Sequence, residues 1–186
     1  MLLTRPPRPI LRQFVKILWA MDQQASPFPV FAVRERVLPT GTMHLVIRLS
    51  NHPLRLFDDV HDCTRREIGY AIVGGARSTF YVRDISEPTR SIGAQLLPGA
   101  ADLILGVPAD ELAGRHTPLE DLWGHSAVEI RERLLEGGSL ERQLDIFEAL
   151  LVARLPRIHG LHPAVAHALE RFSTTADVRE VMPSSF

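Results

Sequence analysis

Cysteine and lysine are almost absent from this sequence, and each absence narrows what the protein can be. The 186 residues include a single cysteine, Cys63, so no internal disulfide can form, which is typical of proteins from a reducing compartment. Lysine occurs only at Lys16, and all the other basic residues are arginine. We attribute this bias to GC-rich coding before any role in binding phosphate.

Long apolar runs and an excess of positive charge are also missing. The first ten residues, MLLTRPPRPI, lack the apolar run of a signal peptide, and nowhere do about 18 apolar residues follow one another, the length a membrane span needs. The net charge of −1 argues against a surface dominated by nucleic-acid binding, because phosphate contacts need clustered basic residues. We therefore expect a cytoplasmic protein with no membrane contact.

The spacing of apolar residues differs between the two halves of the chain, and in the first half it predicts β-strands. Between residues 11 and 91 apolar residues recur mainly at every second position, which is typical of β-strands. Strands are expected at 14–19, 30–38, 42–49, 54–57, 67–73, 79–85 and 91–97, and Pro39-Thr40-Gly41 favours a hairpin between the second and the third. Seven short strands without an intervening long helix predict an antiparallel sandwich or small barrel.

The second half follows a helical period. A short helix is expected at 100–105, closed by Gly106, and capping boxes are expected at 117–120 and 126–129. Ser139 is expected to cap the longest helix, 140–155, and another helix follows at 163–172. The sequence thus predicts an α+β fold, with an antiparallel barrel followed by a small helical bundle.

The longest helix carries an apolar stripe that can pack in either of two places. Its members share one helix face, and they are Leu140, Leu144, Phe147 and Leu151. A second stripe makes the helix apolar over much of its circumference, so it should be covered on more than one side. Burial in the chain's own core and contact with a second subunit both stay open.

Five segments, taken in order and spacing, resemble a known family. They are ERVLPTG at 35–41, VGG at 73–75, QLLPGAA at 95–101, GVP at 106–108 with Glu111 and Leu112, and PLEDLWG at 118–124. Together they resemble the N-terminal effector-binding and dimerisation domain of AraC-type transcriptional regulators, over roughly Trp19 to Val181.

The resemblance implies an architecture and a role. It implies a cupin-like, jelly-roll-like barrel over 1–97, a helical dimerisation and linker region over 98–172, and the start of a helix-turn-helix domain over 173–186. It also implies a homodimer, paired through the long helix, and a small-molecule effector. DNA contact would be made only through helix-turn-helix motifs that follow in that family, and this sequence stops at Phe186. We therefore expect a regulatory domain that does not itself bind DNA.

Polar residues interleaved with the strands are the candidate ligand site. His44 and Arg48 share a strand face, and the others are Arg77, Tyr81 and Gln95. If they point into the barrel they form an effector pocket, and two arginines would favour an anionic ligand through paired bonds to a carboxylate. If they point outward they are the solvated face of antiparallel strands.

Catalytic, metal and cofactor patterns are weak throughout. The eight histidines do not show the two-histidine spacing of a cupin metal site, and VGG at 73–75 is followed by a strand rather than by the helix that a phosphate loop needs. Cys63 lies in a polar loop. We expect no catalytic residue, no metal and no cofactor.

Two alternatives remain open beside the sensor. They are a dimerisation scaffold without a ligand and a cupin-like enzyme. An open cavity lined by His44, Arg48 or Gln95 would favour the sensor, and a barrel filled by leucine and phenylalanine would favour the scaffold.

Overall fold

The computed structural model describes residues 1–23, 34–59, 61–62, 64–155 and 163–174. The chain divides into two compact units, Met1–Leu155 and Pro156–Phe186. The first unit contains both sheets and most of the helices. In the second, the structure describes one helix, α6 (Pro163–Thr174), at the place where the sequence predicts it.

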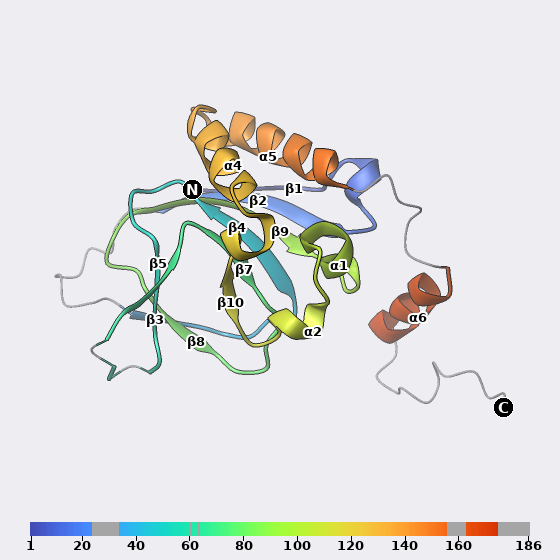
Figure 1. Ribbon diagram of the computed structural model, residues 1–186, viewed down its shortest axis with the longest axis horizontal. Helices are drawn as coiled ribbons and strands as arrows, with labels where there is room; N and C mark the ends of the chain where they lie inside the picture. The colour runs from blue at the N-terminus through green and yellow to red at the C-terminus, as the bar shows by residue number, and fades with distance from the viewer. Residues whose placement is uncertain (24–33, 60, 63, 156–162, 175–186) are drawn as a thin grey trace. The chain divides into compact units, whose positions relative to one another are not determined.

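The first unit contains two antiparallel sheets, shown in Figure 1. In order across the larger sheet, the strands are β1 (Leu2–Arg5), β2 (Val15–Gln23), β9 (Thr89–Leu96), β4 (Met43–Arg48), β7 (Ala71–Gly74) and β10 (His116–Pro118). Across the smaller sheet they are β3 (Arg34–Val37), β8 (Tyr81–Asp84), β5 (Leu54–Phe57) and β6 (Arg66–Gly69). The predicted α+β class with antiparallel sheets is confirmed.

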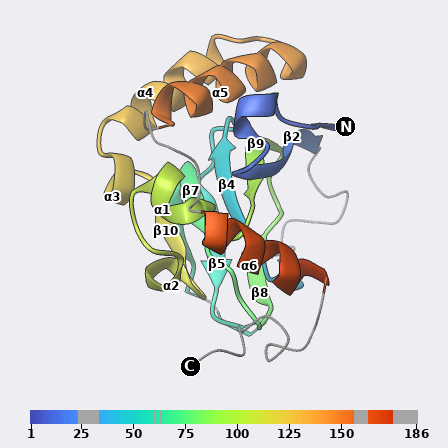
Figure 2. The ribbon, with the colours of Figure 1, turned by 90° about the vertical axis from the view of Figure 1, so that its right-hand side faces the viewer.

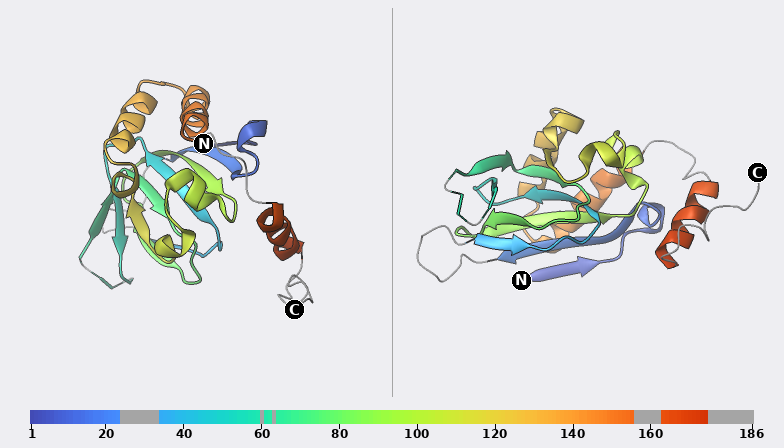
Figure 3. Two further views of the ribbon diagram at one scale, coloured as in Figure 1. Left: turned by 45° about the vertical axis from the view of Figure 1, so that its right-hand side comes forward. Right: turned by 90° about the horizontal axis from the view of Figure 1, so that it is seen from below.

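Helices cover one face of the larger sheet. Those in the first unit are a 3-10 helix, η1 (Pro9–Leu11), and α1 (Ala100–Leu105), α2 (Ala109–Leu112), α3 (Glu120–Trp123), α4 (Ser126–Leu135) and α5 (Leu140–Arg154). The pair α4 and α5 lies together against the sheet in every view (Figures 1, 2 and 3), and α5 packs on β2 and β9. The main hydrophobic core fills the layer between this sheet and the helices.

The apolar stripe of α5 belongs to that core. Its four residues, Leu140, Leu144, Phe147 and Leu151, are all at most 6% exposed. The stripe therefore presents no surface to a second subunit, and burial in the chain's own core is the destination that the structure gives it. A dimer contact through α5 would have to use another face of the helix.

One expected strand, 67–73, is two strands in different sheets. The chain leaves β6 of the smaller sheet at Gly69 and enters β7 of the larger sheet at Ala71. Gly69 has φ of +131°, a conformation that residues with a side chain rarely adopt, and it allows the abrupt change of direction. Local alternation continues through the turn, so the pattern alone does not reveal the break.

The capping box expected at 117–120 is wrong. Thr117 and Pro118 lie in β10, which pairs with β7, and α3 begins at Glu120 without a side-chain cap. Pairing with β7 satisfies backbone groups that would otherwise lie at a sheet edge. The range 98–172, expected to be helical, thus also contributes the strand β10 to the larger sheet.

The other helix signals have mixed outcomes. Ser139 does cap α5, because its Oγ accepts a hydrogen bond from the Arg142 N–H at 3.3 Å. Gly106 ends α1 in a left-handed conformation, φ +82°, as expected. Ser126 is the first residue of α4 rather than its cap, and no side chain caps that helix.

Candidate functional site

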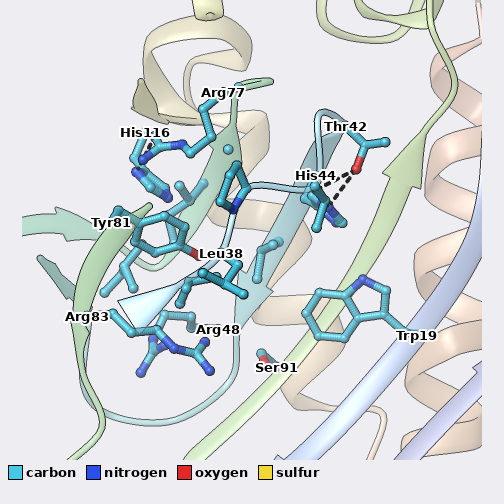
Figure 4. A pocket seen from close by; sticks show the side chains of 18 of the residues that line it. Trp19, Leu38, Thr42, His44, Arg48, Arg77, Tyr81, Arg83, Ser91 and His116 are labelled. Atoms are coloured by element: carbon cyan, nitrogen blue, oxygen red, sulfur yellow. Dashed lines mark hydrogen bonds between the residues drawn. The ribbon is translucent and has the colours of Figure 1, made fainter. Parts of the chain in front are cut away.

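A pocket of about 260 Å³ opens between the two sheets. Residues of β2, β4, β7 and β9 form one wall, residues of β3, β5 and β8 form the other, and the loop after β3 contributes to the rim (Figure 4). Strand alternation explains its position, because the opposite face of the larger sheet is buried under helices. The side chains that alternate with the buried ones lie on the other face of this sheet and line the pocket.

Strand β4 shows this division residue by residue. Leu45 and Ile47 are fully buried in the core on the helix side. His44, Val46 and Arg48 alternate with them and line the pocket. The period-two pattern predicts this shared face, and the structure directs it into a cavity rather than into solvent.

Arg48 is a buried cation at the end of β4. Its side chain is 6% exposed, Nε donates to the His52 carbonyl oxygen at 3.1 Å, and Nη2 donates to Thr89 Oγ1 at 3.3 Å. Burial, followed by the nearby charge of Arg83, lowers its pKa to about 10, so it stays protonated at neutral pH. Within the described ranges no carboxylate forms an ion pair with Arg48.

Arg77, Tyr81 and His116 form a cluster at another side of the pocket. Arg77 Nη2 lies 3.1 Å from both the Gly114 carbonyl oxygen and His116 Nδ1. Arginine only donates, so Nδ1 must accept, and the ring hydrogen lies on Nε2. The Arg77 guanidinium lies 4.7 Å from the Tyr81 ring centre, and the Tyr81 and His116 rings meet edge to face at 4.4 Å.

Burial keeps this cluster from changing charge near neutral pH. Burial first, and then the charges of Arg77 and Arg66, lower the pKa of His116 to about 4. Burial also raises the pKa of Tyr81 and lowers the pKa of His44. The histidines and the tyrosine are thus neutral hydrogen-bonding groups, and the arginines carry the positive charge of the pocket.

Gln95 supports the pocket from the neighbouring strand β9. It lies opposite His44 in the register of β9 with β4, and its Nε2 donates to Thr42 Oγ1 at 3.1 Å. Thr42 Oγ1 in turn lies 3.1 Å from His44 Nε2. Of the five predicted site residues, four line the pocket, and Gln95 positions the hydroxyl beside one of them.

Two glycines shape the cavity. Gly93 lies beside Trp19 in the sheet, and a Cβ there would come within 2.4 Å of Trp19 Cζ2, so its absence lets the indole lie against the strand. Gly74 lies between His44 and His116 in the register of three neighbouring strands. A Cβ at Gly74 would lie 3.8 Å from its nearest atom, Cδ2 of His116, which is an ordinary van der Waals contact, and Gly74 itself lines the pocket.

Four further residues line the pocket that are not among the predicted site residues, and they are Trp19, Arg83, Ser91 and His116. A signal existed for Arg83, which lies two residues after Tyr81 and therefore on the same strand face. His116 could not be found locally, since the residues after it resemble a helix start. Arg83 also pairs with Glu35, its Nε lying 2.5 Å from Glu35 Oε2.

Several expectations lie partly or wholly outside these observations. Cys63 and residues 175–186, the expected helix-turn-helix start, are not among the described residues. Among those that are, no three or more His, Cys, Asp or Glu side chains gather closely enough to hold a metal ion. No helix in the described part has the length and apolarity needed to cross a bilayer.

Comparison with known proteins identifies the family. A family model described as a domain of unknown function (DUF6597) matches residues 3–118, more than half of the 186 residues. No curated protein and no solved structure matches the chain. The matched range includes every residue that lines the pocket, from Trp19 to His116. The chain therefore belongs to the DUF6597 family of domains.

Proposed function

We propose that this chain is the ligand-sensing regulatory domain of a cytoplasmic AraC-type transcriptional regulator. The observation that carries the proposal is the open cavity between the sheets, lined by His44 and Arg48. A pure dimerisation scaffold would fill that space with apolar side chains, as the layer under the helices is filled. In this proposal the two sheets are the halves of a cupin-like barrel, and the part described here makes no contact with DNA.

A physical link from the pocket to the helices supports regulation. Arg131 of α4 donates from Nε to the Arg48 carbonyl oxygen at 3.0 Å and from Nη2 to the Ser50 carbonyl oxygen at 3.2 Å. Its guanidinium also lies 4.2 Å from the Tyr70 ring centre. The backbone that carries Arg48 is thus held directly by α4. A ligand that displaces Arg48 would bias the helix position, and a coupling of about 1–3 kcal/mol is enough for a switch.

Binding fits the pocket better than catalysis. An effective general base has a pKa near the working pH, and the pKa of His116, at about 4, is far below it. Nδ1 of that ring is also occupied by the hydrogen bond from Arg77. The cupin-like enzyme is therefore not our proposal for this site.

A homodimer is the second part of the proposal, with its contact moved away from the buried stripe. Ile146 and Leu150 lie on a partly exposed apolar face of α5, and Leu135 at the end of α4 is 43% exposed. Leu150→Glu should dissociate a dimer formed there, measured by light scattering over a dilution series. Ile10→Glu, at a residue 54% exposed outside these helices, is the matched control. Unchanged mass in Leu150→Glu would exclude this face.

Sensing is tested by a search that assumes no ligand class. The two tryptophans are Trp19, in the pocket, and Trp123, in the core, so Trp123→Phe leaves Trp19 as the sole fluorescent reporter. Fractions of a bacterial metabolite extract are then added to this variant. Gly74→Val in the same background adds side-chain volume at a residue that lines the pocket beside His116, without changing charge.

We expect at least one fraction to change Trp19 emission saturably and to lose its effect when the pocket is filled. If every fraction acts equally on both proteins, the scaffold alternative is correct.

A further inference from the structure

The three arginines of the pocket differ in what neutralises them. Arg83 is paired with the carboxylate of Glu35. Arg77 is hydrogen-bonded to Gly114 and His116 and stands over an aromatic ring. Arg48 is the most buried, yet over the described residues it has one carbonyl and one hydroxyl as acceptors and no carboxylate.

A buried charge without a counter-ion is unfavourable, because little Coulomb energy offsets its lost hydration. The guanidinium has five N–H donors and faces the pocket, so part of its bonding capacity remains for a ligand. Asp84 contributes some negative potential, but burial and the positive charges of Arg83 and Arg55 outweigh it. The end of the pocket at Arg48 is therefore complementary to an anion.

Neighbouring groups favour a planar acid at that end. Ser91 lies directly opposite Arg48 in the register of β9 with β4 and lines the pocket, so its hydroxyl can donate to the same acid (Figure 4). A carboxylate accepts two parallel N–H bonds from one guanidinium, which fixes its orientation as well as its charge. The fork geometry of Arg48 fits that arrangement.

Apolar side chains form another part of the pocket lining, away from the polar groups already described. Trp19 and Tyr81 come from different sheets and stand on two sides of the space in Figure 4, with Leu38 at the rim. Val46 and Ile72 add aliphatic surface to the lining. The volume of about 260 Å³ lies below the usual range of about 300–1,000 Å³ for small-molecule sites, which favours a compact ligand.

We propose that the pocket binds a small organic carboxylate with an apolar body, the acid group against Arg48 and the body between Trp19 and Tyr81. This inference rests on the proposed sensing function and specifies the class of effector. It explains in one arrangement why a cation is buried without a carboxylate partner and why aromatic and aliphatic side chains line the same pocket.

Matched acids and amides test the acid group directly. Benzoate, phenylacetate and hexanoate are titrated into the protein by calorimetry, and each is compared with its neutral amide. We expect at least one acid to bind about ten- to hundredfold more tightly than its amide, the range for a charge-assisted bond. Arg48→Met should abolish that preference, and Arg133→Met, an equal charge change at an exposed residue of α4, should preserve it.

The remaining outcomes distinguish failure of the carboxylate proposal from failure of the sensing proposal. If an amide binds as tightly as its acid, or if Arg48→Met keeps the preference, the carboxylate assignment is wrong while the sensor proposal stands. If inorganic phosphate competes as strongly as the acids, the site recognises charge alone and the assignment is also wrong. If no acid binds at millimolar concentration, the inference fails, and the extract experiment with Gly74→Val decides the sensing function independently.

Discussion

Replacement of Arg48 by methionine separates a ligand-binding role from a structural one in the absence of any ligand. Methionine keeps the unbranched length of the side chain and removes the guanidinium, and the residue is only 6% exposed. Burial lowers the pKa of Arg48 from its usual value to about 10, and each pKa unit corresponds to about 1.4 kcal/mol. The folded state therefore carries the cation at a disadvantage of about 3 kcal/mol relative to the unfolded chain.

Opposing effects reduce that figure. The variant leaves the His52 carbonyl and the Thr89 hydroxyl without their donor, and each such loss costs about 1 kcal/mol. We therefore expect the ligand-free Arg48→Met protein to be more stable than the parent by about 1–2 kcal/mol, measured by urea unfolding at pH 7. Arg133→Met, at an exposed residue, should change stability by no more than about 0.5 kcal/mol.

A loss of stability in Arg48→Met would contradict a ligand-binding role for Arg48. A loss of more than about 1 kcal/mol in Arg48→Met would mean that the guanidinium holds the empty fold together. Arg48 would then be a structural residue, and its burial would no longer point to a bound anion. Unchanged far-UV circular dichroism is required for either reading, because the comparison assumes that both proteins keep the same fold.

Three further predictions follow from single contacts. Gly93→Ala should destabilise by about 1–3 kcal/mol and shift Trp19 emission, since the new Cβ lies 2.4 Å from the indole, whereas Gly74→Ala, with 3.8 Å to its nearest atom, should be almost neutral. The free energy of unfolding should fall by up to about 3 kcal/mol as pH drops from 6.5 to 4, because histidine in the unfolded chain takes up a proton in this range while His116 in the folded protein, with a pKa of about 4, stays neutral. His116→Asn should make this dependence on pH less steep. An unchanged dependence in the variant would contradict the lowered pKa of His116. Leu144→Ala should cost about 2–5 kcal/mol at every protein concentration, and a concentration-dependent loss would return that side chain to a dimer interface.

The features that could be predicted from the sequence are those that depend on neighbouring residues. The alternation along residues 42–49 places His44 and Arg48 on one face, and the serine at 139 marks the start of α5, because both signals depend on near neighbours. The alternation does not say whether that face meets solvent or a second sheet. That distinction depends on which strands pair across the fold.

The features that could not be predicted depend on contacts between residues far apart in the chain. His116 reaches the pocket only because β10 joins β7, more than forty positions earlier in the chain, and this pairing overrides a good capping sequence. The same holds for α5, whose apolar stripe is equally suited to a core or to a partner helix. The layer of the sheet beneath it decides between them.

The most direct test of organic-acid binding is a titration of Trp123→Phe protein with benzoate, phenylacetate and hexanoate in turn, followed by the emission of Trp19. We expect at least one acid to cause a saturable change with a dissociation constant below about 1 mM, lost in Gly74→Val and weakened at least about tenfold in Arg48→Met. No change with any of the three acids, or the same change in Gly74→Val, would contradict the binding of an organic acid between the two sheets.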